Sequence, residues 1–90
     1  MLPEKRQPTH PGEILLEEFL KPMGMTQLEL AGKIKVPIQR INTLVNGKRG
    51  VTPETAILLS RVFNNSPEFW MNLQTAFDLY LARKYLDKAA

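Results

Sequence analysis

Apolar residues recur along the chain three or four positions apart, and no segment alternates between apolar and polar residues as a half-buried strand does. Residues that start a helix precede each apolar stretch, and residues that stop a helix follow it. The pattern therefore predicts an all-α fold of five short helices. They are expected at about residues 11–21, 27–34, 37–45, 53–63 and from 67 onward.

The first predicted helix opens at the run His10-Pro11-Gly12-Glu13. Proline suits the first helical position, and an acid in the first turn suits the helix dipole. Pro22 and Gly24 are expected to end this helix at about Lys21. Its buried stripe is expected to consist of Leu15, Leu16, Phe19 and Leu20.

The second and third helices are short and separated by a tight turn. Thr26 and Glu29 form the signature of a capping box, in which each side chain bonds the other residue's amide. Pro37 disfavours helical geometry in the residue before it, which puts the turn at Lys35-Val36 and starts the third helix at Pro37. With the small Ala31 where the helices approach, residues 26–45 are predicted to be a helix-turn-helix, which can place its second helix in the major groove of DNA.

The net charge of +3 is modest, but the charges are distributed unevenly. Between Glu29 and Glu54 there are five basic residues and no acidic one, whereas the rest of the chain carries seven basic and nine acidic residues. A basic segment in a slightly acidic body is expected of a protein that binds a polyanion. The alternative is an ordinary helical hairpin with a solvated, lysine-rich face. The absence of acids and the polar third helix favour DNA binding.

The third helix supplies the candidate base-reading residues. We predict that Gln39, Arg40 and Thr43 read bases, because glutamine can pair with adenine, arginine with guanine or a phosphate, and threonine with a polar edge or the thymine methyl. Asn42 is also polar and on this face, but because it lies near the helix end its role could be structural instead of base reading. The inner face of this helix is expected to hold Ile38, Ile41, Leu44 and Val45. Phosphate contacts are expected from Gln27, Lys33, Lys48 and Arg49.

The last helix has two apolar sides. The main stripe consists of Phe69, Trp70, Leu73, Ala76, Phe77, Tyr80 and Leu81. The second side consists of Met71, Leu79, Ala82, Tyr85 and Leu86. A helix that is apolar on two sides usually buries both, which predicts a homodimer on a pseudo-palindromic DNA site. Packing of the second side against the chain's own first helix is the alternative. The predicted dimer interface consists of Leu79, Ala82, Tyr85 and Leu86.

Composition argues against other classes of protein. The chain has no cysteine, one histidine, no glycine-rich phosphate loop and no metal-ligand spacing, so neither an enzyme nor a cofactor is expected. No apolar run approaches the roughly 20 residues of a membrane span, and the start lacks a signal-peptide core, so a cytoplasmic location is expected. Residues 1–9 are expected to be a flexible arm, and residues 10–90 one DNA-binding domain with a C-terminal dimerisation helix.

Several motifs together resemble a known family. The runs 26–31 (TQLELA) and 46–49 (NGKR), with Ile41 between them, resemble the Xre/Cro-type repressors, which have a five-helix lambda-repressor-like domain. The motifs outside the helix-turn-helix look like the HigA branch of bacterial type II antitoxins, and the similarity covers about residues 8–80. These motifs are HPGE at 10–13, TPETA at 52–56, SPEFWMNLQ at 66–74 and FDL at 77–79.

The resemblance implies a dimeric antitoxin that silences a RelE-like, mRNA-cleaving toxin and represses the promoter of their shared operon. Such toxins are basic, so Glu13, Glu17 and Glu18 are candidate toxin contacts, although they are also an ordinary solvated helix face. Lys35 stands where the repressor pattern often has glycine, and Pro37 where serine or threonine is more usual. The alternatives are a stand-alone or phage-type repressor without a toxin, and a protein-interaction module that has lost DNA binding.

Overall fold

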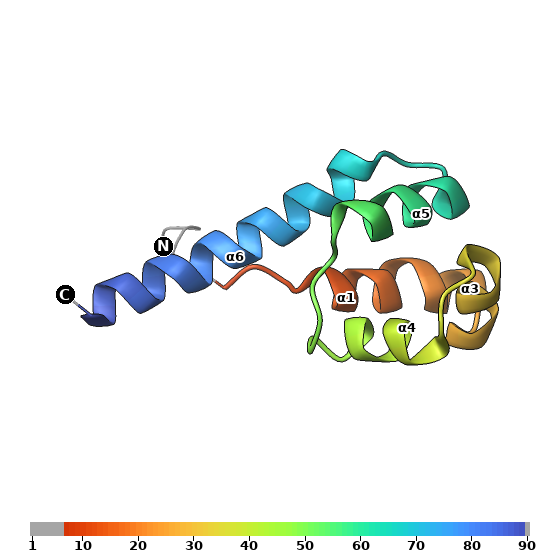
Figure 1. Cartoon of the computed structure of the whole chain (residues 1–90), viewed down its shortest axis with the longest axis horizontal. Coiled ribbons are helices and arrows are strands. Elements are labelled where there is room, and N and C mark those ends of the chain that lie inside the picture. The colour runs from red at the N-terminus through yellow and green to blue at the C-terminus, as the bar shows by residue number, and fades with distance from the viewer. Residues whose placement is uncertain (1–6, 90) are drawn as a thin grey trace.

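The computed structural model describes residues 7–89, and over these residues the chain forms five helical segments and no strand (Figure 1). This confirms the predicted all-α class. The segments are α1 (Pro11–Ile14) continued by the π-helical η2 (Leu15–Leu20) and α2 (Lys21–Met23), then α3 (Gln27–Ile34), α4 (Ile38–Val45), α5 (Pro53–Phe63) and α6 (Pro67–Ala89). Most of the predicted arm, residues 1–6, lies outside the described residues.

The helices enclose one apolar core, from which the C-terminal half of α6 projects (Figure 1). The continuous segment α1–η2–α2 contributes Leu15 and Leu20, which are almost completely buried. Trp70 at the start of α6 is also fully buried, and its indole N–H donates to Asn65 Oδ1 at 3.0 Å. The Phe19 ring packs against the Trp70 ring with 5.1 Å between centroids, so α6 is fixed to the first helical segment.

Side-chain caps set most of the helix boundaries where the sequence predicts them. Thr26 Oγ1 accepts from the Glu29 amide at 3.0 Å, and Glu29 Oε1 accepts from the Thr26 amide at 2.8 Å, so the predicted capping box is confirmed. The backbone hydrogen bond from Thr26 lowers the pKa of the Glu29 carboxyl. Lys35 ends α3 in the left-handed conformation, with φ of 59°, and Asn64 ends α5 with φ of 57°.

The first helical segment continues past the predicted end at Lys21. Pro22 lies within it, and the segment stops only at Gly24, whose φ is +64°. Proline has no amide hydrogen to donate and its ring crowds the preceding turn. The wider π-helical turn before it, in which the Lys21 amide donates to Leu16 O, gives that ring room.

Three further expectations were wrong in detail. Pro37 is the extended residue that caps α4, with ψ of 147°, and is not its first helical residue. Ile38 was expected in the core, but it begins α4 beside the turn and is 38% exposed. The last helix is not short but 23 residues long, and parts of the expected main stripe are exposed. These parts are Phe69, Ala76 and Leu81.

His10 joins the start of α1 to α6. Its Nδ1 accepts from the Gly12 amide at 2.9 Å, which caps the helix, and its ring packs in a T-shaped arrangement with the Phe77 ring, with 4.9 Å between centroids. Burial lowers the pKa of His10, and the charges of Asp78 and Glu13 oppose this shift. The folded protein therefore favours the neutral imidazole, which keeps Nδ1 free to accept.

The stability of the protein is expected to fall as the pH drops below the ordinary histidine pKa of 6.5. Because folding lowers the pKa of His10, its contribution is present above 6.5 and is lost as the pH falls towards the folded-state value. Protonation removes the capping acceptor, a loss of up to about 1 kcal/mol. Urea unfolding at pH 7.5 and pH 5.5 measures this difference in the free energy of unfolding. A His10→Asn variant, which can cap without titrating, should lose less stability over that interval; an equal loss would contradict this role.

Candidate nucleic-acid interface

The helices α3 and α4 pack as a helix-turn-helix. Ala31 of α3 and Ile41 of α4 are buried in the core, so the two helices approach closely. The Val36 amide donates to Ala31 O at 3.0 Å and closes the turn. Lys35 supplies the left-handed residue of this turn, at the position where the related pattern often has glycine. One face of α4 points into the core, and the opposite face is free, with Gln39 and Asn42 exposed.

The free face of α4 is polar, but its side chains are not equally available. Gln39 is exposed, whereas Thr43 is half-buried and its hydroxyl donates to Gln39 O at 2.9 Å or to Arg40 O at 3.2 Å. Asn42 Nδ2 donates to Gln27 Oε1 at 3.4 Å, which links α4 to the first turn of α3. This bond fits the structural alternative for Asn42. Gln39 is therefore the predicted base-reading residue with the freest polar side chain.

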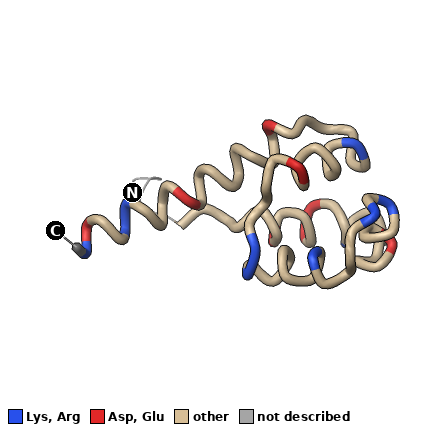
Figure 2. The backbone as a smooth tube through the Cα atoms, viewed as in Figure 1, with Lys and Arg blue, Asp and Glu red and all other residues tan. Residues whose placement is uncertain are grey.

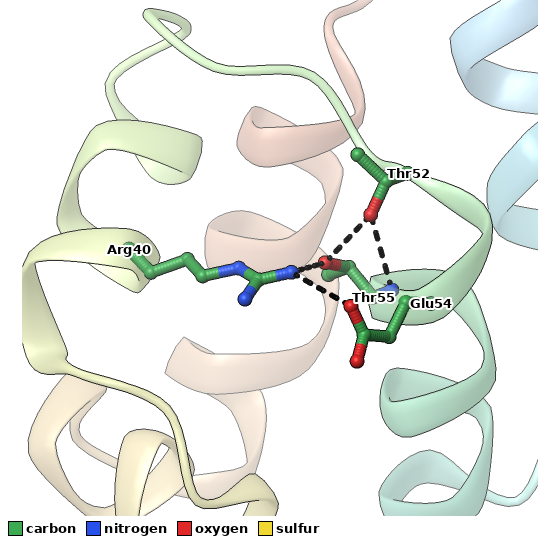
Figure 3. Close-up of polar contacts among 4 residues, drawn as sticks. All are labelled: Arg40, Thr52, Glu54 and Thr55. Atoms are coloured by element: carbon green, nitrogen blue, oxygen red, sulfur yellow. Dashed lines mark hydrogen bonds and ion pairs between the residues drawn. The ribbon is translucent and has the colours of Figure 1, made fainter.

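Arg40 is tied to α5, a contact that was not predicted from the sequence. Its Nη2 donates to Thr55 Oγ1 at 2.9 Å and lies 3.8 Å from Glu54 Oε1 (Figure 3). Thr55 is buried, and its amide donates to Thr52 Oγ1 at 3.3 Å as part of the α5 cap. The guanidinium thus links α4 to the start of α5. No sequence signal identified Glu54 as a partner of Arg40.

Basic side chains surround the helix-turn-helix. Figure 2 shows Lys and Arg along the part of the body that contains α3, α4 and the loop after α4. Of the residues predicted to contact phosphates, Lys33, Lys48 and Arg49 are exposed, and Gln27 is half-buried at the start of α3. Exposed cations that flank a polar helix can bind the sugar-phosphate backbone while that helix lies in a groove.

The acidic residues of the first helical segment are exposed. Glu13, Glu17 and Glu18 all face solvent, and Glu17 Oε2 pairs with Lys21 Nζ at 2.9 Å. An exposed ion pair of this kind contributes little to stability. These carboxylates therefore remain available to a basic partner.

The predicted dimer residues lie on the projecting half of α6 (Figure 1). Leu79, Tyr85 and Leu86 are 46%, 71% and 62% exposed, and Ala82 is exposed as well. The alternative, that this side packs on the chain's own first helix, does not hold for these residues. An apolar surface of this kind on a projecting helix is typical of an interface.

Within residues 7–89, no three His, Cys, Asp or Glu side chains are grouped so that they could hold a metal ion. In that same part of the chain, no helix combines the length and the apolar character needed to cross a membrane.

Comparison with known proteins gives a consistent result. The helix-turn-helix family HTH_3 matches residues 16–70. Virulence-associated protein I of Dichelobacter nodosus is 48% identical over 75 residues, 83% of this chain and 69% of that protein. Antitoxin HigA-1 of Vibrio cholerae is 44% identical over 87 residues, 94% of this chain and 81% of that protein. The solved structure of the Pseudomonas aeruginosa antitoxin HigA with the higBA promoter is 40% identical, covers 91% of this chain and 89% of that chain, and superposes with a TM-score of 0.87.

Proposed function

The chain belongs to the HigA-type antitoxins of the helix-turn-helix family, and on that basis we propose that it is a dimeric antitoxin that represses its own operon and neutralises a RelE-like toxin. It is a DNA-binding regulator by family and not an enzyme. The observation that carries the proposal is the free polar face of α4, held by α3 and surrounded by exposed cations. The similarity to an antitoxin solved with its promoter supports double-stranded operator DNA as the ligand.

Each predicted contact has a role in this proposal. Gln39 reads a base, and the phosphates are bound by Gln27, Lys33, Lys48 and Arg49. Thr43 can reach a base with its methyl group while its hydroxyl remains bonded to the helix backbone. Arg40 can read bases if its guanidinium leaves Thr55. If it stays bonded to Thr55, it orients α4 and contacts the DNA with its remaining N–H groups.

Dimerisation through α6 would put two copies of α4 on one face of the duplex. Helix-turn-helix dimers bind half-sites about one helical turn apart, roughly 34–36 Å. The exposed apolar residues on the projecting half of α6 support this arrangement, since the described part of the chain leaves them uncovered. The operator is therefore expected to be pseudo-palindromic.

The toxin is proposed to bind the outer surface of the first helical segment. Glu13, Glu17 and Glu18 are exposed there and would attract a basic protein. Co-purification with the product of the neighbouring gene, expected to be a basic protein of about 90–110 residues, tests this partner. A Glu17→Lys, Glu18→Lys variant should lose it, and the matched Glu68→Lys change on α6 should not. A repressor without a toxin would show no partner at all.

Replacing Gln39 with alanine is expected to weaken binding to operator DNA and to leave binding to a random duplex almost unchanged. A bidentate contact to a base is worth about 1–3 kcal/mol of discrimination, which corresponds to roughly 5- to 150-fold in Kd. Fluorescence anisotropy with a duplex from the promoter of the chain's own gene measures it. Leu28→Ala, at an exposed residue outside α4, is the control. Equal affinity of Gln39→Ala and wild type for the promoter duplex would remove Gln39 from the reading surface.

A further inference from the structure

The loop at residues 46–52, between α4 and α5, carries Lys48 and Arg49 on its exposed side. Its first half continues from α4: the Gly47 amide donates to Leu44 O at 3.0 Å and the Lys48 amide to Thr43 O at 2.9 Å. These bonds fix the beginning of the loop to α4. These two bonds do not involve the second half of the loop, after Arg49.

Gln74 of α6 holds that second half. Its side chain is 8% exposed, and its Oε1 accepts from the Val51 amide at 2.7 Å. Its Nε2 donates to Asp78 Oδ1 at 2.9 Å, one turn further along α6. The carboxamide is thus oriented from both ends: Asp78 fixes the amino group, which turns the carbonyl oxygen towards the loop.

Gly50 makes this contact possible. A Cβ atom at this position would lie 2.9 Å from both Nε2 and Oε1 of Gln74, closer than real Cβ contacts. Any side chain at residue 50 would therefore require the carboxamide of Gln74 to shift from this position. The glycine, the buried glutamine and the aspartate form one small cluster, whose glycine directly follows the exposed Lys48 and Arg49 in the loop.

We propose that Gln74 is a positioning residue for DNA binding: it holds the loop at residues 46–52 so that Lys48 and Arg49 meet the phosphates beside the groove occupied by α4. This inference rests on the proposed DNA-binding function. A loop fixed at both ends loses less conformational freedom when it binds than a loop fixed at one end. Gln74 and Asp78 directly precede the exposed half of α6, so the helix proposed to form the dimer also sets the geometry of the phosphate-binding loop.

The test is a Gln74→Leu variant of the full chain, in which Leu has similar size but cannot bond the Val51 amide. Its Kd for a random 30-base-pair duplex and for the promoter duplex is measured at several salt concentrations. Each phosphate contact contributes about 0.9 to the slope of log K against log salt, so losing two should lower the slope by roughly 1–2. Affinity at low salt should fall by about tenfold or more on both duplexes, because phosphate contacts act on any sequence.

Two further variants separate positioning from loss of structure. Gln74→Glu combined with Asp78→Asn exchanges the two groups, keeps an acceptor for Val51 and a hydrogen bond within α6, and leaves the net charge the same; it should restore the wild-type salt slope. In a Lys48→Ala, Arg49→Ala background, Gln74→Leu should have no further effect on the slope. Asn72→Ala, at an exposed α6 position, should match wild type.

A folded, dimeric Gln74→Leu variant with the wild-type salt slope would overturn the inference, as would an additive loss in the Lys48→Ala, Arg49→Ala background. If Gln74→Leu does not fold, Gly50→Ala displaces the same carboxamide and should reproduce the lower slope; a wild-type slope there would equally contradict the inference. Failure of the proposed function gives a different result, since wild type itself would then bind neither duplex.

Discussion

Replacing Gly12 with alanine is expected to destabilise the protein severely. Gly12 is buried where α1 meets the end of α4, and a Cβ atom there would overlap the carbonyl oxygen and carbon of Leu44. Both partners are backbone, so no side-chain rotation relieves the contact, and the two helices must separate. Overpacking commonly costs about 1–3 kcal/mol and more where the backbone cannot yield. A loss of about 3 kcal/mol would lower the Tm of a 90-residue domain by roughly 12–24 °C.

Thermal unfolding followed by circular dichroism measures this effect, and the chain offers a matched control. Gly32 lies inside α3, is exposed, and an added Cβ would meet nothing within 4 Å. Gly32→Ala should therefore raise stability by roughly 0.5–1 kcal/mol through the better helix propensity of alanine. If Gly12→Ala unfolds within a few degrees of wild type, the close packing of α1 on α4 is wrong.

Glutamate at both Leu79 and Leu86 is expected to abolish the dimer and most of the operator affinity. The two leucines lie seven residues apart on one side of the exposed half of α6, where two copies would bury them against each other. Charges there would be desolvated in a dimer but solvated in a monomer. A monomer reaches only one half-site at a time, and losing the linked second site lowers affinity by about 100-fold or more.

Sedimentation and operator titration measure the two consequences separately. Leu81→Glu is the control, because Leu81 is 44% exposed, close to the 46% of Leu79, but lies on another side of the same helix. It should leave dimers that bind the operator with wild-type affinity. Dimers that persist in the Leu79→Glu, Leu86→Glu variant would show that the interface lies elsewhere.

Local signals accounted for most of the fold. Helix caps act on residues only a few positions away, so the sequence alone places the corresponding helix ends. These caps are Thr26 with Glu29 for α3, and Thr52 and Asn64 at the two ends of α5. Pro22 was misjudged because its effect depends on the hydrogen-bond spacing of the turn before it, which the sequence does not show. The burial of Ile38 was wrongly predicted, because helical spacing identifies the inner face of a helix but does not show whether neighbouring helices cover the end of that face.

The candidate site was predictable only where each residue acts alone. Exposed groups such as Gln39 and Lys48 follow from helix position and residue type. Arg40 and Gln74 do not, because the partner of Arg40 lies on α5 and the partner of Gln74 lies in the loop before α5, 15 and 23 residues away in sequence. Base reading by Arg40 stays a prediction, and the sequence did not show that its guanidinium contacts Thr55. Gln74 belongs to a motif that the sequence singled out, but only tertiary packing shows that it supports the loop.

Hydroxyl-radical footprinting of the wild-type protein on the promoter of its own gene tests the central proposal most directly. Two bound copies of α4 should protect two related half-sites on one face of the duplex, with centres about 10–10.5 base pairs apart. Protection should disappear with Gln39→Ala at concentrations where wild type fills the site. Uniform protection without half-sites, or none at concentrations that saturate a random duplex, would contradict sequence-specific DNA binding by α4.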